Sequence, residues 1–341
     1  MTRSIEIRRL ARTGHTLTTL GLGTAPLGGM YSAVGDAAAH ETIAAAWDAG
    51  IRYFDTAPFY GYGAAEHRVG ETLRERPRGA WTLSTKVGRL LRPAATGAPA
   101  AAHATGGDAW VQPLPFEPVF DYSAAGVRRS IEDSLQRLGT HRIDIALVHD
   151  IGRSTHGALH DRYWQQLTTG GFRELEAVKR EGLIGAIGLG VNEWEVVMDA
   201  MQHIDLDCTL LAGRYTLLEQ GALTPFLDAC LQRELSVIAG GPFNSGVLVG
   251  GPNYNYAQAP LAIVQRVQRL REACDEAGVP LPAAALQFPL AHPAVVACLP
   301  GVRSAAELRQ LLAWWQHDIP AALWQSLRRL GLLQEAAPVP S

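Results

Sequence analysis

Short apolar runs alternate with longer amphipathic segments along nearly the whole chain, and this alternation is what most constrains the fold. Apolar runs of about 4–8 residues are typical of buried strands, whereas apolar residues spaced three and four apart are typical of helices. The chain repeats this pair of patterns from end to end. We expect strands at 20–23, 52–55, 82–86, 143–149, 186–190, 208–212, 235–239 and 295–299.

A helical pattern follows each expected strand, often with a glycine where it stops. Gly139 and Gly182 are two such stops, and a further helix is expected near the C-terminus, at 320–333. The helical stretches include "HETIAAAWDAG", "AAGVRRSIEDSLQRLG", "FRELEAVKREGLIG", "TPFLDACLQRE", "IVQRVQRLREACDEAG" and "SAAELRQLLAWW".

Eight strand-then-helix units predict an α/β protein with a single (β/α)₈ barrel over residues 1–341. Two short strands around Thr13 and Gly14 predict an N-terminal β-hairpin that caps one end of the barrel. The extra C-terminal helix is expected to be followed by a frayed tail after about residue 333.

The segment 89–122 interrupts the alternation. It is rich in Ala, Gly and Pro and has no clear periodicity. A loop of this length inside a compact domain is usually a functional lid or a disordered segment. We therefore predict a long loop here, and the sequence leaves open whether it closes over a substrate.

Composition excludes several classes of function. The chain is 47% hydrophobic and 18% charged with a net charge of -3, so it lacks the basic surface that nucleic acid requires. It has no apolar run of the ~20 residues that span a membrane. The four cysteines are far apart, which argues against a metal site or a disulfide framework. A reduced, cytoplasmic protein is the expectation.

Polar residues end three of the expected strands. Asp55, Lys86 and His149 close strands two, three and four, and Tyr60 lies on the loop just after Asp55. In a barrel of this kind the carboxyl ends of the strands form the active-site face. Each residue alone has an ordinary explanation, as a cap, a solvent-reaching lysine, a core histidine or a packing aromatic. Together they predict one catalytic site.

The chemistry of these four groups suits acid–base catalysis. A phenol has an ordinary pKa near ~10, and a nearby ammonium lowers it. Lys86 is the candidate ammonium, with Asp55 as its counter-ion. Tyr60 would then give or take a proton, and His149 would orient the substrate oxygen.

Several stretches make the chain resemble the aldo-keto reductase family. They are "FDTAPFYGYGAAEHRVGETL", "LSTKVGR", "SLQRLGTHRIDIALVHD", "GAIGLGVN" and "CLPGVRS". The resemblance runs from the hairpin to the helix after residue 304. It implies the same barrel, NAD or NADP as cofactor, and Asp55, Tyr60, Lys86 and His149 as catalytic residues.

Further stretches, "KVGRLL", "FDYS", "RIDIALVHDIG" and "LLAGRYTLLEQ", are similar to one branch of that family. The branch contains D-threo-aldose 1-dehydrogenase, L-fucose dehydrogenase, L-galactose dehydrogenase and pyridoxal 4-dehydrogenase. The first expectation is oxidation of an aldose at C1 to the aldonolactone. Oxidation of the pyridoxal hemiacetal, reduction of an aldehyde or ketone, and a non-catalytic subunit that senses the cofactor stay open. The expected partner is a small sugar or hemiacetal, which Asp150 and segment 89–122 would contact. The presence of Asp150 is explained equally well if it is an ordinary carboxylate at the protein surface.

Two segments after the last two strands are expected to hold the cofactor, because phosphate sites in such barrels often lie there. The glycines of "AGGPFNSGVL" let backbone N–H groups approach an anion, and "LPGVRSAAEL" opens a helix whose N–H groups favour one. Glu307 slightly favours NAD over NADP as the cofactor, since a carboxylate repels a 2′-phosphate. The alternative role of Glu307 is to form a capping box with Ser304 at the start of the helix. The resemblance adds Asn192 as the residue that binds the nicotinamide carboxamide. The expected cofactor residues are Asn192, Gly241, Pro242, Phe243, Ser245, Gly246, Gly301, Arg303 and Glu307.

Three positions depart from the pattern of the wider family. Val191 stands where a serine commonly precedes the carboxamide-binding asparagine, and Ala212 where a glutamine is usual. Gly240 stands where an aromatic residue often stacks on the nicotinamide. Phe243 and Tyr215 are the candidates to replace that aromatic ring.

Overall fold

The computed structural model describes residues 4–94 and 110–340. Eight parallel strands form one sheet in the order β14-β11-β10-β9-β8-β5-β4-β3. The bridges Leu20–Cys298 and Gly23–Gly301 join the two edges of the sheet, so the predicted barrel is confirmed. The strands are β3 (Leu22–Gly23), β4 (Tyr53–Asp55), β5 (Thr82–Val87), β8 (Ile143–His149), β9 (Ile184–Val191), β10 (Cys208–Ala212), β11 (Ser236–Gly240) and β14 (Val295–Leu299).

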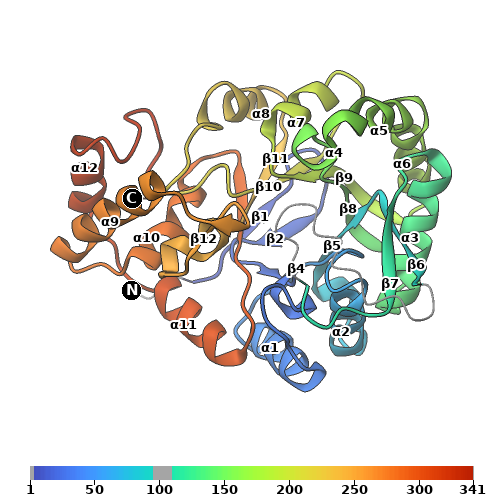
Figure 1. Cartoon of the computed structure of the whole chain (residues 1–341), viewed down its shortest axis with the longest axis horizontal. Helices are drawn as coiled ribbons and strands as arrows, with labels where there is room; N and C mark the ends of the chain where they lie inside the picture. Colours follow the sequence, from blue (N-terminus) through green and yellow to red (C-terminus); the bar gives the residue numbers. More distant parts are fainter. Residues whose placement is uncertain (1–3, 95–109, 341) are drawn as a thin grey trace.

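Helices surround the strands on all sides of the barrel (Figure 1). They lie there because their apolar faces pack against the outer side chains of the strands. The predicted glycine stops are confirmed: Gly139 ends α3 with φ 61°, and Gly182 follows α6 with φ 80°. The principal helices are α1 (Asp36–Asp48), α2 (Ala64–Leu73), α3 (Ala124–Leu138), α6 (Phe172–Arg180), α7 (Trp194–Ala200), α8 (Asp228–Gln232), α9 (Leu261–Glu276), α10 (Leu281–Gln287), α11 (Ala305–Trp315) and α12 (Ala321–Arg329).

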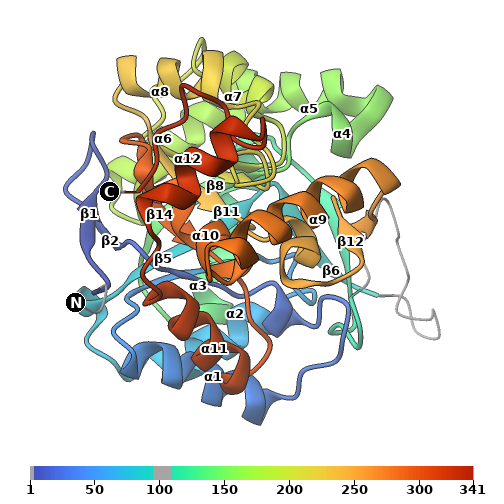
Figure 2. The same cartoon turned by 90° about the vertical axis from the view of Figure 1, so that its left-hand side faces the viewer.

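The inside of the barrel is filled by side chains from alternate strand positions. Ile145 and Leu147 of β8 and Ile238 of β11 belong to this inner cluster. Leu10 and Leu17, which flank the turn of the N-terminal hairpin of β1 (Ile7–Arg9) and β2 (Thr16–Thr18), join the same cluster. The hairpin therefore closes one end of the barrel, as predicted. Figure 2 shows β1 and β2 at one side of the molecule and β12 and β6 at the other.

A β-hairpin lies within the segment that we expected to be a loop. β6 (Arg89–Pro93) and β7 (Phe116–Phe120) pair antiparallel, with Arg89 opposite Phe120. The sequence did not indicate this pairing because its partners are distant in the chain and the two strands show no alternation of apolar residues. The middle of the segment, 95–109, lies outside the described residues.

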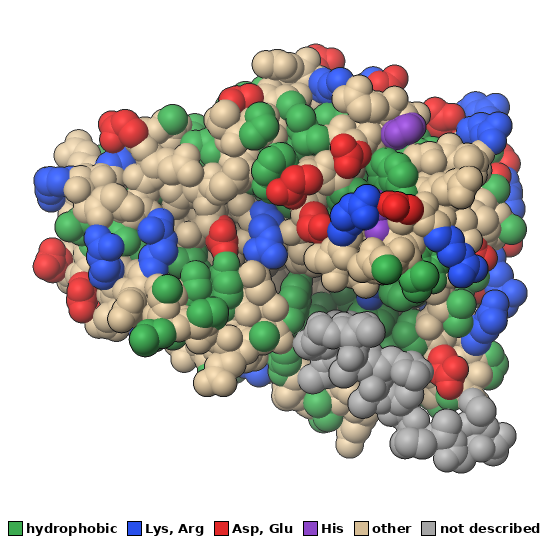
Figure 3. All heavy atoms as spheres, turned by 45° about the horizontal axis from the view of Figure 1, so that its top comes forward, with side chains coloured by type: hydrophobic (Ala, Val, Ile, Leu, Met, Phe, Trp, Pro, Cys, Tyr) green, Lys and Arg blue, Asp and Glu red, His purple; other side chains and the backbone are tan. Residues whose placement is uncertain are grey.

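Other elements stand around the open end of the barrel. The short helices α4 (Arg153–His156) and α5 (His160–Gln166) follow β8, and a small hairpin of β12 (Asn253–Tyr254) and β13 (Ala257–Gln258) follows β11. The predicted extra C-terminal helix is α12, which packs on α9. Among the described residues, no helix is long and apolar enough to cross a membrane. Acidic and basic side chains are interspersed over the face shown in Figure 3.

Candidate active site

A pocket of about 1520 Å³ opens at the carboxyl ends of the strands. Its walls come from the ends of the barrel strands and from the loops that follow β4, β8, β9, β11 and β14. Apart from the stacking candidate Tyr215, every residue that the sequence proposed for catalysis or cofactor binding lines this pocket. These are Asp55, Tyr60, Lys86, His149, Asn192, Gly241, Pro242, Phe243, Ser245, Gly246, Gly301, Arg303 and Glu307.

Lys86 and Asp55 form a buried ion pair at the floor of the pocket. Lys86 Nζ donates to Asp55 Oδ2 at 2.7 Å and to the Thr56 carbonyl at 3.0 Å, while Ser84 Oγ donates to Asp55 Oδ1 at 2.6 Å. The two charged side chains are only 2% and 3% exposed. Burial raises the pKa of Asp55, and the charge of Lys86 opposes that rise. The pair therefore holds an ammonium at a fixed, buried point beside the pocket.

Tyr60 and His149 lie next to this ammonium. Lys86 Nζ is 4.5 Å from the centre of the Tyr60 ring, and the ring of His149 lies edge-on to Tyr60 with 6.0 Å between centres. Burial, followed by the charges of Arg89 and Lys86, holds the pKa of His149 well below its ordinary value. His149 is therefore a neutral imidazole at neutral pH, suited to hydrogen bonding rather than to carrying charge.

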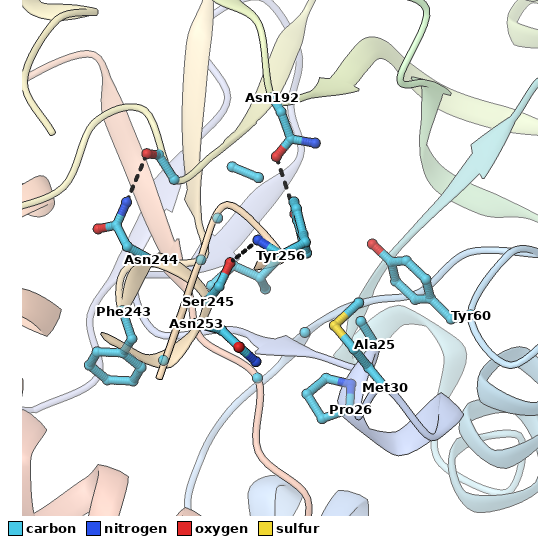
Figure 4. A pocket seen from close by; sticks show the side chains of 18 of the residues that line it. Ala25, Pro26, Met30, Tyr60, Asn192, Phe243, Asn244, Ser245, Asn253 and Tyr256 are labelled. Atoms are coloured by element: carbon cyan, nitrogen blue, oxygen red, sulfur yellow. Dashed lines mark hydrogen bonds between the residues drawn. The ribbon is translucent and has the colours of Figure 1, made fainter. Parts of the chain in front are cut away.

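Local backbone geometry sets the place of Tyr60. Gly61 has φ 62°, and a Cβ there would lie 2.3 Å from the carbonyl oxygen of Gly28. Only glycine permits this close approach, which packs the loop after β4 against the segment after β3. Figure 4 shows Tyr60 at one side of the pocket, near Met30 and across from Phe243.

The segment after β11 offers backbone N–H groups to an anion. Gly241, Ser245 and Gly246 all have positive φ values, of 56°, 59° and 101°. Such left-handed turns form concave sites that bind phosphate groups. Beside this segment, Ser304 Oγ accepts from the N–H of Glu307 and begins α11, and Arg303 and Glu307 at this helix start line the pocket. These donors fit the pyrophosphate of a dinucleotide.

The two aromatic residues proposed to replace the ring absent at Gly240 lie elsewhere. Tyr215 is buried against Phe288 and His292, with 5.3 and 5.6 Å between ring centres. Phe243 lines the pocket but packs edge-on against Trp314 at 5.9 Å, on the side away from Tyr60. Their positions therefore do not support a stacking role beside Tyr60.

The sequence did not indicate Tyr256, which lies at the pocket next to Asn192. Its hydroxyl donates to Asn192 Oδ1 at 3.1 Å, and its N–H donates to Ser245 Oγ at 3.0 Å (Figure 4). Arg214 ties the same parts together, donating to the Asn192 carbonyl at 2.7 Å and to Asn255 Oδ1 at 2.8 Å. The only local signal was the Asn-Tyr turn of the β12–β13 hairpin, a weak one.

Arg303 and Glu307 pair with each other at the pocket edge. Glu307 accepts from the Arg303 backbone at 2.8 Å and from its guanidinium at 3.0–3.1 Å. The capping interaction was predicted in part: Ser304 caps the helix, but Glu307 reaches back to Arg303 rather than to Ser304. The pairing brings Glu307, which is expected to repel a 2′-phosphate, into contact with Arg303, whose guanidinium would attract one.

The fold and the site together define a barrel oxidoreductase with a tyrosine, a lysine, an aspartate and a histidine at its strand ends. The model of the aldo/keto reductase family matches residues 19–331. The chain belongs to this family, whose members use NAD(P)H.

Curated relatives and solved structures agree with this assignment. The chain is 49% identical to pyridoxal 4-dehydrogenase of Microbacterium luteolum over 97% of this chain and 99% of the relative. It is 39% identical to D-threo-aldose 1-dehydrogenase of a Pseudomonas species over 95% and 97%. The holo form of an aldo-keto reductase from Bacillus halodurans superposes with a TM-score of 0.75 at 22% identity, over 98% of each chain, which supports the fold.

Proposed function

We propose that the chain oxidises the carbinol of a cyclic hemiacetal to a lactone, with NAD(P)⁺ as the oxidant. The single observation that carries this is the position of Lys86 Nζ, 2.7 Å from Asp55 Oδ2 and 4.5 Å from the Tyr60 ring centre. An ammonium held there favours the ionised phenol, which is the form that takes a proton from an alcohol.

Each residue has a defined part in this reaction. Tyr60 removes the proton of the carbinol hydroxyl, and Lys86 stabilises the phenolate form of Tyr60. The neutral imidazole of His149 orients the hydroxyl oxygen. Asp55 holds Lys86 in place through their buried contact. NAD⁺ or NADP⁺ supplies the oxidising equivalent by accepting the hydride from the carbinol carbon.

Asn192 and the segments around Gly241 and Ser304 are the residues that would hold the cofactor. Their amide, backbone N–H groups and helix start face one pocket that also contains Tyr60. This arrangement supports a site for the carboxamide and a site for the pyrophosphate within one continuous space. The fit supports a dinucleotide as the cofactor.

Pyridoxal and an aldose are the two candidate substrates, and we place pyridoxal first. The rings of Phe59, Trp110 and Phe120 line the pocket beside Tyr60, and Trp110 lies 5.7 Å from Tyr60 between ring centres. A flat pyridine ring stacks well on such rings. The higher identity to a pyridoxal dehydrogenase, 49% against 39%, supports the same order.

A substrate panel tests the proposal. The purified chain is incubated with NAD⁺ or NADP⁺ and pyridoxal, L-fucose, L-galactose or D-arabinose, and formation of reduced cofactor is followed by absorbance. We expect turnover of pyridoxal, an aldose or both, with a lactone identified by mass spectrometry. Turnover only in the direction of carbonyl reduction, or no turnover despite cofactor binding, would contradict it.

A further inference from the structure

A second buried ion pair lines the pocket beside the catalytic residues. Arg89 Nη2 donates to Asp150 Oδ2 at 2.7 Å, with the side chains 5% and 17% exposed. A buried ion pair rarely adds net stability, because removing two charges from water costs about as much as their attraction returns. The position of this pair therefore suggests a role toward a ligand.

The backbone around each partner is specialised to bring the two together. Gly88 has φ 99°, and a Cβ there would collide with the ring of Tyr122 at 2.2 Å. This turn lets the chain leave β5 and begin β6 with Arg89 at the pocket. Asp150 has φ 42°, which is uncommon for a residue other than glycine and often marks a functional position.

The carboxylate of Asp150 adjoins two groups already assigned to the reaction. His149 Nε2 lies 3.4 Å from Asp150 Oδ2, and Asn192 Nδ2 donates to Asp150 Oδ1 at 3.3 Å. Since the His149 ring also lies beside Tyr60, an oxygen bound at Asp150 is next to the oxygen bound by Tyr60 and His149. The pair of Arg89 and Asp150 thus borders the position where a bound substrate would carry the substituent next to its carbinol.

The guanidinium of Arg89 packs against aromatic rings. It lies over Phe59 at 4.1 Å and near Phe120 at 5.3 Å from the ring centres. Its Nε is buried and has no hydrogen-bond partner within the described part of the chain. A rigid, planar cation beside a carboxylate presents one donor and one acceptor to the same ligand oxygen.

We propose that Arg89 and Asp150 bind the oxygen substituent that neighbours the carbinol of the substrate, and so select substrates that carry it. The 2-hydroxyl of an aldose would accept from Arg89 and donate to Asp150. The hydroxyl on the pyridine ring of pyridoxal, when ionised, would accept from Arg89. This inference rests on the proposed oxidation of a cyclic hemiacetal and specifies how its substrate is recognised.

Substrates that lack this oxygen provide the test. Each active substrate of the panel is paired with its deoxy analogue, the 2-deoxy aldose or pyridoxal without its ring hydroxyl. We expect kcat/KM of wild type to fall about 10- to 100-fold for the analogue, the effect of leaving a buried polar site unsatisfied. A loss with the 2-deoxy aldose indicates that the pair binds the 2-hydroxyl of the aldose, and a loss with the pyridoxal analogue indicates that it binds the hydroxyl on the pyridine ring.

Variants then assign the loss to the pair. Arg89→Met should reduce the discrimination to less than about threefold with either substrate, and Asp150→Asn should do so with the aldose, by slowing the parent substrate more than the analogue. Arg153→Met is the matched control, because Arg153 pairs with Asp161 at 2.8 Å in an exposed position, 66% and 77% exposed. That control should keep the wild-type ratio. Arg89→Lys keeps the charge and serves if Arg89→Met fails to fold.

The outcomes separate this inference from the proposed function. Oxidation of parent and analogue at equal kcat/KM by wild type would overturn the role of the pair and leave the oxidation standing. Retained discrimination in folded Arg89→Met and Asp150→Asn would overturn it as well. Absence of any lactone would instead overturn the proposed function.

Discussion

Two buried ion pairs lie on opposite faces of strand β5, one toward the inside of the barrel and one toward the helices outside it. Lys86 and Asp55 meet at 2.7 Å and line the pocket. Arg137 of α3 and Glu66 of α2 meet at 2.5 Å between two helices. Side chains alternate along β5, so Lys86 points inward while its neighbour Thr85 points outward and donates to Glu66 Oε1 at 2.7 Å.

The difference shows that burial of charge does not by itself identify a catalytic group. Both pairs are withdrawn from water, but only the inner pair shares the pocket with Tyr60 and His149. The outer pair satisfies polar groups where two helices and a strand meet. We therefore expect the inner pair to govern rate and pH dependence and the outer pair to govern stability.

Replacement of Tyr60 is the strongest test of the inner site. Tyr60→Phe should lower kcat by ~10²–10⁴-fold, the usual contribution of a general acid–base group. The dissociation constant for NAD⁺, measured by quenching of tryptophan fluorescence, should change less than about threefold because the hydroxyl is what is lost. A fall in kcat of less than tenfold would assign the proton transfer to another residue.

Replacement of Lys86 should move the pH dependence as well as the rate. Lys86→Met removes the ammonium that favours the ionised phenol, so the rising limb of the kcat profile should shift to higher pH. At neutral pH we expect a loss of about 10²-fold. Lys86→Arg, which keeps a positive charge, should shift the profile less. An unchanged profile in Lys86→Met would make Lys86 a structural residue.

The outer pair should give the opposite pattern. Glu66→Gln leaves Arg137 without its counter-charge and should lower the free energy of unfolding by about 3 kcal/mol, measured by urea denaturation. Activity per folded molecule should stay near wild type. Asp133→Asn is the control, on the helix α3 that carries Arg137, since its partner Arg129 is 66% exposed. A large loss of kcat in folded Glu66→Gln would remove the distinction between the pairs.

These two pairs also show what the sequence could predict. Asp55 and His149 end their strands and Lys86 is one residue from the end of β5, and the barrel brings strand ends together, so their meeting followed from the order of elements. Glu66 and Arg137 lie on helices, where spacing along the chain gives no indication of which faces will touch. Their contact required the packed structure.

The pocket side chains on irregular segments were the hardest to predict. Arg89 meets Asp150 only because Gly88 turns the chain into β6, a strand without an alternating pattern. Tyr256 reaches Asn192 from a two-residue turn whose sequence is an ordinary one. In both cases the conformation of a loop decides the contact, and loop conformation is not encoded by hydrophobic periodicity.

Tyr256 and Asn192 form a neutral hydrogen-bonded pair at the pocket, which can be compared with the two ion pairs. Tyr256→Phe removes the bond to Asn192 Oδ1, which leaves the amide less fixed. A net hydrogen bond is worth about 1 kcal/mol, so the dissociation constant for NAD⁺ should rise about fivefold, with little change in thermal stability. Equilibrium fluorescence titration measures the first and calorimetry the second. Unchanged cofactor affinity would make the hairpin contact a structural one.

The half-exposed pair of Arg303 and Glu307 should show the smallest effect, on the choice between NAD⁺ and NADP⁺. Glu307→Arg releases Arg303 from its contacts with the carboxylate and adds a second cation at the pocket edge. The ratio of kcat/KM for NADP⁺ over NAD⁺ should rise about 3- to 10-fold, because charge-assisted bonds to the 2′-phosphate become available. Glu272→Arg, on the exposed face of α9, controls for the change in net charge. A wild-type preference for NADP⁺ above about tenfold would contradict the expected preference for NAD⁺. An unchanged ratio in the variant would leave Glu307 as a helix-capping residue. The pair of Arg303 and Glu307 would then serve the fold alone, like the pair of Glu66 and Arg137.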